Sequence, residues 1–232
     1  MHPTVLSTAV ADVVVWSPGD VSAFAGFVFV KQKAAYEIWY GLVGSGMCIR
    51  DRSGLAQLIG REIAAAEAGQ PSGIIIKINA ITDPEMVRHL YRASQAGVHV
   101  DLLVRGVCVL RPGVPGVSDH IRVRSIIGRF LEHSRIFWFA NAGDPKVYIG
   151  SADVMERNLD RRVEVLCPVT DPKQADHLRS VVLTAYLGDN RRGRVLTANG
   201  SYERDPDALD GDTQSAQDLL LAGYAAESRS DL

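Results

Sequence analysis

The residues of this sequence best suited to phosphate chemistry are the consecutive Glu132, His133, Ser134 and Arg135. A neutral imidazole can attack phosphorus or transfer a proton near pH 7. A nearby cation and a small hydroxyl side chain would offset phosphoryl charge. We therefore predict that His133 is a catalytic residue that also binds phosphate, and that Arg135 binds phosphate. This short pattern is not specific by itself, and a structural histidine is the alternative.

Arg105 is the second candidate because it follows a predicted strand. Residues 98–104 (VHVDLLV) are predicted to form a strand, and ligands of open α/β sheets bind at the carboxyl ends of strands. The stretch 105–162 has ten Lys and Arg against six Asp and Glu, a local charge of +4 in a chain of net charge −2. Because a guanidinium suits phosphate oxygens, we predict that Arg105 binds phosphate. The alternative is a solvated face whose arginines pair with carboxylates.

Alternating helix and strand patterns, which would position these residues, extend over 53–190. Residues 55–69 have helical spacing, and the β-branched run 73–79 predicts a strand before the strand at 98–104. Asp83, followed by proline, is typical of a helix start between the two strands. Strand, helix and strand within about 30 residues predict a parallel βαβ unit. Further strands are predicted at 121–126, 135–140, 146–151 and 162–169, and a further helix at 171–186.

These elements predict an α/β fold, a sandwich with a mixed sheet flanked by helices. Residues 53–190 would form the catalytic domain. Residues 191–232 are expected to be a C-terminal extension, with a short strand, a turn and a terminal helix.

Residues 1–52 have a different character, with weak periodicity and no clear capping. KQKAAYEI (31–38) and LVGSGMCIRDR (42–52) resemble translated sequencing adapters. We interpret 31–52 as adapter translation and 1–30 as a chimeric or misframed leader, artefactual or disordered. A divergent linker is the alternative.

Composition excludes several classes of protein. The net charge of −2 argues against a bulk binder of nucleic acid or of membrane surfaces. No apolar run reaches the ~18 residues of a transmembrane helix. The three cysteines are far apart, which is typical of reduced thiols in a cytosolic protein. We expect a cytoplasmic location and keep membrane association open. No P-loop and no Cys/His metal-ligand spacing occur, so no transition-metal site is predicted.

Five motifs carry a family resemblance. They are LVRG (103–106), LRPGVPG (110–116), RSIIGRFLEHSR (124–135), YIGSAD (148–153) and RNLDRRVEV (157–165). With the sequence around them, over 53–190, they resemble the C-terminal catalytic domain of the long ATP-dependent bacterial polyphosphate kinases. This domain is phospholipase D-like, and His-Ser-Arg at 133–135 resembles the HxK element of that superfamily.

The resemblance implies reversible transfer of the ATP γ-phosphate to inorganic polyphosphate, through a phosphohistidine and with Mg²⁺. It implies that ATP or ADP and polyphosphate are the partners, with no nucleic acid, and that the full-length enzyme is a homo-oligomer. It also implies that Arg105 and His133 contact ATP phosphates.

Two departures limit the resemblance. Val154 stands where the family usually has tryptophan, which affects packing and no phosphate ligand. The family's nucleophilic histidine and Mg²⁺-linked residues lie in a preceding domain, and nothing in 1–52 resembles it. We therefore expect this fragment alone to be inactive and to hold no metal.

Two other functions stay open. The first is a phospholipase D-like phosphodiesterase or nuclease that dimerises to pair two copies of His133. The second is a non-catalytic polyanion-binding module that uses the basic stretch 105–162.

Overall fold

The computed structural model describes residues 52–162, 164–205 and 213–230. The predicted leader 1–30 and the adapter-like segment 31–52 lie outside these residues, apart from Arg52.

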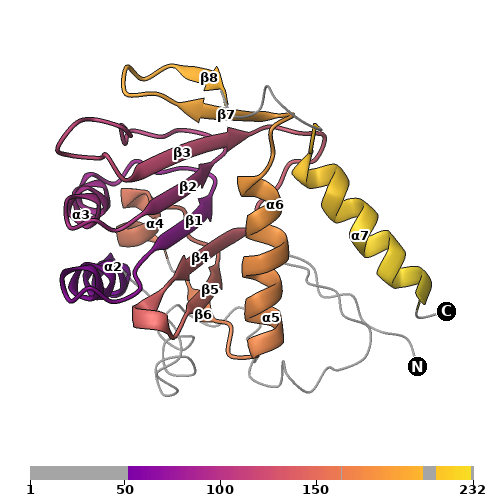
Figure 1. Cartoon of the computed structure of the whole chain (residues 1–232), viewed down its shortest axis with the longest axis horizontal. Coiled ribbons are helices and arrows are strands. Elements are labelled where there is room, and N and C mark those ends of the chain that lie inside the picture. The colour runs from indigo at the N-terminus through magenta and orange to yellow at the C-terminus, as the bar shows by residue number, and fades with distance from the viewer. Residues whose placement is uncertain (1–51, 163, 206–212, 231–232) are drawn as a thin grey trace. The chain divides into compact units, whose positions relative to one another are not determined.

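An eight-stranded mixed sheet forms the centre of the described structure (Figure 1). Its strands are β1 (Ile74–Ile78), β2 (Val100–Val104), β3 (Ile121–Ile126), β4 (Arg135–Phe139), β5 (Lys146–Gly150), β6 (Leu166–Pro168), β7 (Gly193–Leu196) and β8 (Tyr202–Arg204). They lie in the order β6-β5-β4-β1-β2-β3-β7-β8. Strand β2 is parallel to β1 and to β3, and the other neighbouring pairs are antiparallel. The predicted mixed sheet and the predicted parallel pair are confirmed.

Helices cover both faces of the sheet. They are α2 (Arg52–Glu67), α3 (Pro84–Gln95), α4 (Glu156–Arg161), α5 (Pro172–Asp176), α6 (Thr184–Leu187) and α7 (Ala216–Ser230), with a 3-10 turn η2 (Asn141–Gly143) and a π-helix η3 (His177–Leu183). Helices α2 and α3 share one hydrophobic core with the sheet, and α5, η3 and α6 share a second one with its other face (Figure 1). The predicted sandwich is therefore present.

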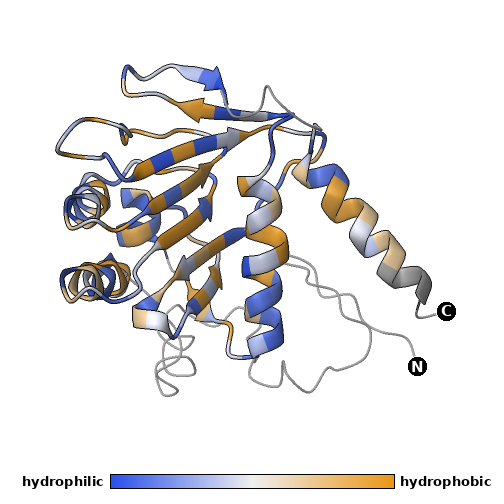
Figure 2. Cartoon of the chain, viewed as in Figure 1, coloured by the Kyte–Doolittle hydropathy of each residue, from blue (hydrophilic) through white to orange (hydrophobic). Residues whose placement is uncertain are grey.

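Strand β1 is buried along its whole length because both faces of the sheet are covered. Ile74, Ile76 and Ile78 contribute to one core, and Ile75 contributes to the other. Figure 2 shows the corresponding concentration of hydrophobic residues on the central strands. Lys77 is the one charged residue of β1, and it is only 7% exposed. A buried ammonium needs partners, so Lys77 marks a polar region within the second core.

The start of α3 confirms the predicted cap. The carboxylate of Asp83 accepts hydrogen bonds from the amides of Glu85 and Met86, at 3.0 and 2.9 Å. Pro84 occupies the first turn, where no amide hydrogen is required. The Nη2 atom of Arg52, at the start of α2, lies 2.5 Å from the same carboxylate. The cap therefore also fastens α2 to α3.

Two elements differ in detail from the prediction. The strand predicted at 162–169 is confined to β6, because the Glu164 side chain bonds to neighbouring side chains before the ladder begins. The helix predicted at 171–186 includes the π-helix η3. There the hydroxyl of Thr184 donates to the carbonyl of Arg179, five residues earlier, at 3.1 Å. This side-chain bond supports the wider turn, which local helix patterns do not reveal.

The sheet continues past residue 190, where the predicted domain ends. Strand β7 pairs with β3, with Gly193 opposite Ile126, and β8 extends the edge. Helix α7 then begins at Ala216, which is fully buried in the second core. The strand, turn and terminal helix expected in 191–232 are all present.

Candidate active site

The carboxyl ends of β1 and β2 bring Arg105 next to Asn79. The two strands are parallel, with Ile78 opposite Val104. Arg105 then donates to the Asn79 Oδ1 atom from Nη2 at 2.9 Å and from Nε at 3.3 Å. The amide of Gly106 donates to the Asn79 carbonyl at 2.7 Å, and a Cβ at Gly106 would lie 2.9 Å from that oxygen. The glycine therefore permits the close approach that aims Arg105.

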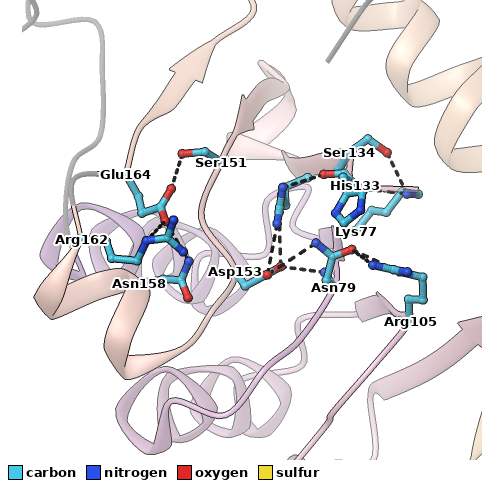
Figure 3. A network of polar contacts seen from close by, with 11 residues as sticks. Lys77, Asn79, Arg105, His133, Ser134, Ser151, Asp153, Asn158, Arg162 and Glu164 are labelled. Atoms are coloured by element: carbon cyan, nitrogen blue, oxygen red, sulfur yellow. Dashed lines mark hydrogen bonds and ion pairs between the residues drawn. The ribbon is translucent and has the colours of Figure 1, made fainter. Parts of the chain in front are cut away.

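Asp153 joins the end of β1 to the start of β4. It accepts a hydrogen bond from the Asn79 amide at 2.8 Å (Figure 3) and forms an ion pair with Arg135 at 3.3 Å. Arg135 Nη1 also donates to the His133 carbonyl at 2.9 Å. Arg135 thus supports the backbone of the His133 loop, and its role as a phosphate ligand stays a prediction.

His133 lies on the loop 127–134, between β3 and β4, and is half-buried. In the view of Figure 3 its ring lies between Ser134 and Asn79. The imidazole makes no hydrogen bond to any residue of the described ranges. Both ring nitrogens can therefore bind a ligand, which suits the predicted contact with phosphate.

A small open pocket lies at the same end of β1 and β2. Its lining residues are Lys77, Ile78, Asn79, Leu103, Arg105, Ile126, Glu132 and Tyr186. Of the three predicted site residues, Arg105 lines the pocket, His133 follows the lining residue Glu132, and Arg135 holds the loop through Asp153 and the His133 carbonyl. The structure thus gathers the predicted residues at one edge of the sheet.

Lys77 and Glu132 form an ion pair on the wall of this pocket. Their charged atoms are 2.9 Å apart, and Lys77 Nζ also donates to Ser134 Oγ at 2.8 Å. The same ammonium lies 4.5 Å from the centre of the Tyr186 ring. These contacts connect β1, the His133 loop and α6.

Burial and neighbouring charges shift the ionisation of this group. Burial lowers the pKa of Lys77, and Arg105 and Arg135 lower it further, against the opposing effect of Glu132. Burial alone would raise the pKa of Glu132, but Lys77 and hydrogen bonds from Gln217 and Tyr186 outweigh it, so that pKa is lowered. Burial and Glu132 raise the pKa of Tyr186. Burial therefore outweighs the ion pair in setting the pKa of Lys77, whereas the partners outweigh burial in setting the pKa of Glu132. The reason is that Lys77 is more deeply buried and faces two other cations.

A second polar network holds the motif 148–153. The buried carboxylate of Glu164 accepts from Ser151 Oγ, from Asn158 Nδ2 at 2.9 Å, and pairs with Arg162 at 3.3 Å (Figure 3). The amide of Ser151 donates to the carbonyl of Val165 at 3.2 Å. The RNLDRRVEV stretch therefore stabilises the turn that delivers Asp153.

The ten basic residues of 105–162 fall into two groups, because four of them (Arg105, Arg111, Arg129 and Arg157) pair with no carboxylate of the described residues. Six form ion pairs, namely Arg122, Arg124, Arg135, Lys146, Arg161 and Arg162. For these six, the pairing with carboxylates that the alternative expects is present, while the role of Arg135 as a phosphate ligand stays a prediction. Arg105 pairs with no carboxylate of the described residues and contacts the neutral Asn79 instead. Its charge is therefore the one at the pocket that a bound anion would neutralise.

The sequence reasoning gave no role to Glu132 and did not select Lys77, Asn79, Asp153 and Tyr186 as site residues. Lys77 and Asn79 could have been found by the rule that selected Arg105, since they end the strand parallel to β2. Tyr186 gave no signal, because the π-helix changes the register of its helix.

Potential metal ligands are sparse at this site. Within the described ranges, no group of three or more His, Cys, Asp or Glu side chains is placed to hold a metal ion.

No helix in the described part of the chain has the length and apolar character required to cross a membrane.

Comparisons with family models, sequences and solved structures all identify the same protein family. Residues 45–217 match the family described as polyphosphate kinase C-terminal domain 2, and this match extends beyond 53–190 on both sides. A polyphosphate kinase of Pseudomonas aeruginosa is 47% identical over 82% of this chain and 29% of its own length. The polyphosphate kinase of Thermosynechococcus vestitus is 53% identical over 78% of this chain and 24% of its own length.

A solved structure agrees with these relatives. The crystal structure of the polyphosphate kinase from Porphyromonas gingivalis superposes with a TM-score of 0.72 at 34% identity, over 79% of this chain and 28% of that one. The chain therefore spans less than a third of the length of the polyphosphate kinases it matches. From the matched domain, the identities and the shared fold, we conclude that the chain belongs to the polyphosphate kinase family and corresponds to its C-terminal domain.

Proposed function

We propose that this chain supplies half of an active site that transfers the γ-phosphate of ATP reversibly to inorganic polyphosphate. The observation that carries the proposal is the pocket at the ends of β1 and β2. There the unpaired charge of Arg105 lines the pocket, and the loop of the hydrogen-bond-free His133 ring adjoins it. The family membership supports the choice of ATP and polyphosphate as substrates.

In this proposal Arg105 binds phosphate oxygens with its two-pronged guanidinium, and Asn79 holds the guanidinium in place. His133 donates or accepts a proton, or hydrogen-bonds to phosphate, while a histidine of the preceding domain attacks phosphorus. The phosphoryl group moves from ATP to that histidine, ADP leaves, and a terminal polyphosphate oxygen then takes the phosphoryl group and frees the histidine. Arg135 would bind phosphate with the donor hydrogens that Asp153 and His133 leave free.

The residues present at the pocket do not fit Mg²⁺. Glu132, the carboxylate that lines the pocket, is occupied by Lys77, Tyr186 and Gln217, and the nearby Asp153 is occupied by Asn79 and Arg135. Mg²⁺ binding by a preceding domain, a homo-oligomeric state and a cytoplasmic location stay predictions of the family resemblance.

Binding by the purified chain tests this proposal. Calorimetry should show binding of ATP that Arg105→Ala weakens at least tenfold, with no hydrolysis of a generic phosphodiester. Turnover of the diester would instead favour the phosphodiesterase function. Polyphosphate binding that is equally strong in the wild type and in Arg105→Ala would favour a non-catalytic polyanion-binding module.

A further inference from the structure

Helix α7 contributes one buried side chain to the loop that carries His133. Gln217 lies in the first turn of α7 and is only 6% exposed. Its Oε1 atom accepts a hydrogen bond from the Phe130 amide at 3.0 Å, and its Nε2 atom donates to the Phe130 carbonyl at 3.0 Å. Nε2 also donates to the carboxylate of Glu132. One carboxamide therefore satisfies three polar groups of the loop.

These contacts replace a strand partner. The loop 127–134 forms no ladder, so its peptide groups need other partners. A carboxamide has one donor side and one acceptor side, as a peptide group has, and Gln217 meets both polar groups of Phe130. The glycine at 128 makes room, since a Cβ there would collide with the Gln217 carboxamide. Gln217 is thus fitted to this loop by shape and by hydrogen bonding.

The start of α7 is itself fixed. The amide of Ala216 donates at 2.8 Å to the carboxylate of Asp189, which is fully buried just after α6. The amide of Gln214 donates to Asn190 Oδ1 at 2.6 Å. Tyr186, whose hydroxyl bonds to Glu132, belongs to the same α6. The loop before His133 is therefore held to α6 and α7 by anchored side chains.

The contacts reach the site through one residue. Glu132 accepts from Gln217 and pairs with Lys77 of β1, and His133 is the next residue of the chain. Arg135 holds the carbonyl of His133 from the other side. The imidazole has no hydrogen-bond partner among the described residues, so its polar anchoring comes from the backbone on its two sides.

We propose that Gln217 is a positioning residue, which holds Phe130 and Glu132 so that the His133 ring is oriented toward bound phosphate. This inference rests on the function proposed above for His133. It makes α7 a part of the active site, although α7 lies outside the predicted catalytic domain.

The first test measures the hydrogen bonds in the 232-residue chain. Gln217→Met keeps most of the side-chain volume and removes the bonds. The Phe130 amide should then exchange its hydrogen at least tenfold faster by NMR. The matched control is Gln214→Ala, which alters an exposed glutamine nearby and should leave the rate unchanged. An unchanged Phe130 rate in Gln217→Met would overturn the proposal.

The second test measures turnover in a complete polyphosphate kinase that carries these residues. Because a misplacement of about 1 Å can cost ~100-fold, Gln217→Met should lower kcat by about 10–100-fold with little change in the KM for ATP. Gln217→Glu keeps the acceptor for the Phe130 amide but places a second carboxylate next to that of Glu132. The other groups that face Glu132 are Lys77 and Tyr186. The activity of Gln217→Glu should recover as the pH falls from 7 toward 5.5, unlike that of Gln217→Met.

A double variant separates this inference from the proposed function. In a His133→Ala background, Gln217→Met should cause no further loss, because both changes act on the same group. A multiplicative loss would contradict action through His133. If His133→Ala itself is fully active, the proposed function of His133 fails, whatever the exchange rate of Phe130 shows about the hydrogen bonds.

Discussion

The three cations at the pocket differ in their partners, and this difference separates their roles. Lys77 and Arg135 are neutralised by Glu132 and Asp153. Arg105 is held only by the neutral Asn79. A side chain that keeps its charge unpaired beside a pocket is poised for an anion, whereas a paired one mainly shapes the site.

Replacement of Arg105 by lysine tests whether the shape of the guanidinium matters. Arg105→Lys keeps the charge but loses the two-pronged contact with phosphate. A lost hydrogen bond to a charged group is worth about 1.5–3 kcal/mol, so kcat/KM for ATP in the complete kinase should fall about 10–100-fold. Arg122→Lys, at an exposed ion pair with Asp101, is the matched control and should be neutral. Wild-type kinetics in Arg105→Lys would show that the two-pronged contact of Arg105 with phosphate is not required.

Replacement of His133 separates catalysis from structure. A positioned acid or base contributes about 10²–10⁴-fold, so His133→Ala in the complete kinase should lower kcat by that factor. The melting temperature should hardly change, because the half-buried ring has no hydrogen-bond partner among the described residues. His133→Gln should retain part of the activity if the ring only hydrogen-bonds. A collapsed melting temperature in both variants would point to a structural histidine.

At the scale of elements, local patterns predicted most of the fold. Asp83 before proline marked the start of α3, and the apolar runs on either side marked β1 and β2. The π-helix and the joining of β7 to β3 depend on a Thr184 side-chain bond and on long-range pairing, which no local pattern contains. The site divides in the same way.

The place of Arg105 beside the pocket was predictable because it follows a predicted strand, and His133 was selected because of its neighbours in sequence. Glu132 and Gln217 meet only in the folded chain, 85 residues apart. Lys77 is an intermediate case, since its strand was predicted but its burial on a doubly covered sheet was not.

The Lys77–Glu132 ion pair joins β1 to the His133 loop, so loss of the Lys77 charge should lower the free energy of unfolding. Lys77→Met leaves the largely buried carboxylate of Glu132 without its cation, which costs up to about 3–5 kcal/mol of unfolding free energy in denaturant titrations. The double variant Lys77→Met/Glu132→Gln should recover much of this loss. Lys146→Met, at an exposed pair, should cost less than about 1 kcal/mol. Equal losses at Lys77 and Lys146 would contradict the burial argument.

The same pair predicts a pH dependence of stability. Because the folded pKa of Glu132 lies below its ordinary value of 4.5, its contribution to stability is complete above pH 4.5 and is lost as the pH falls through the lowered value. In Lys77→Met, burial dominates and raises that pKa, so this variant should gain stability as the pH falls from 7 to 5. The wild type should stay level over that range. Parallel stability curves would show that Lys77 does not control the ionisation of Glu132.

At the scale of the whole molecule, one of the five histidines in the described part, His133, adjoins the pocket. His99 and His120 lie just before β2 and β3, at the opposite ends of these strands from Arg105, and their rings meet edge to face with centroids 5.1 Å apart. His177 contacts the Tyr224 hydroxyl at 2.9 Å, and His89 lies within α3. His133 remains, and the family resemblance gives the phosphorylated histidine to another domain.

The 232-residue polypeptide should therefore not phosphorylate itself. It spans 29% of the Pseudomonas aeruginosa polyphosphate kinase it matches, and we expect His133 to assist the attack of a histidine that lies in the rest of such an enzyme. Incubation with γ-labelled ATP should leave no acid-labile, base-stable label on the chain. A complete polyphosphate kinase, treated in parallel, should be labelled and serves as the positive control. Label on the isolated chain that disappears in His133→Ala, but not in His177→Ala, would show that His133 itself carries the phosphoryl group.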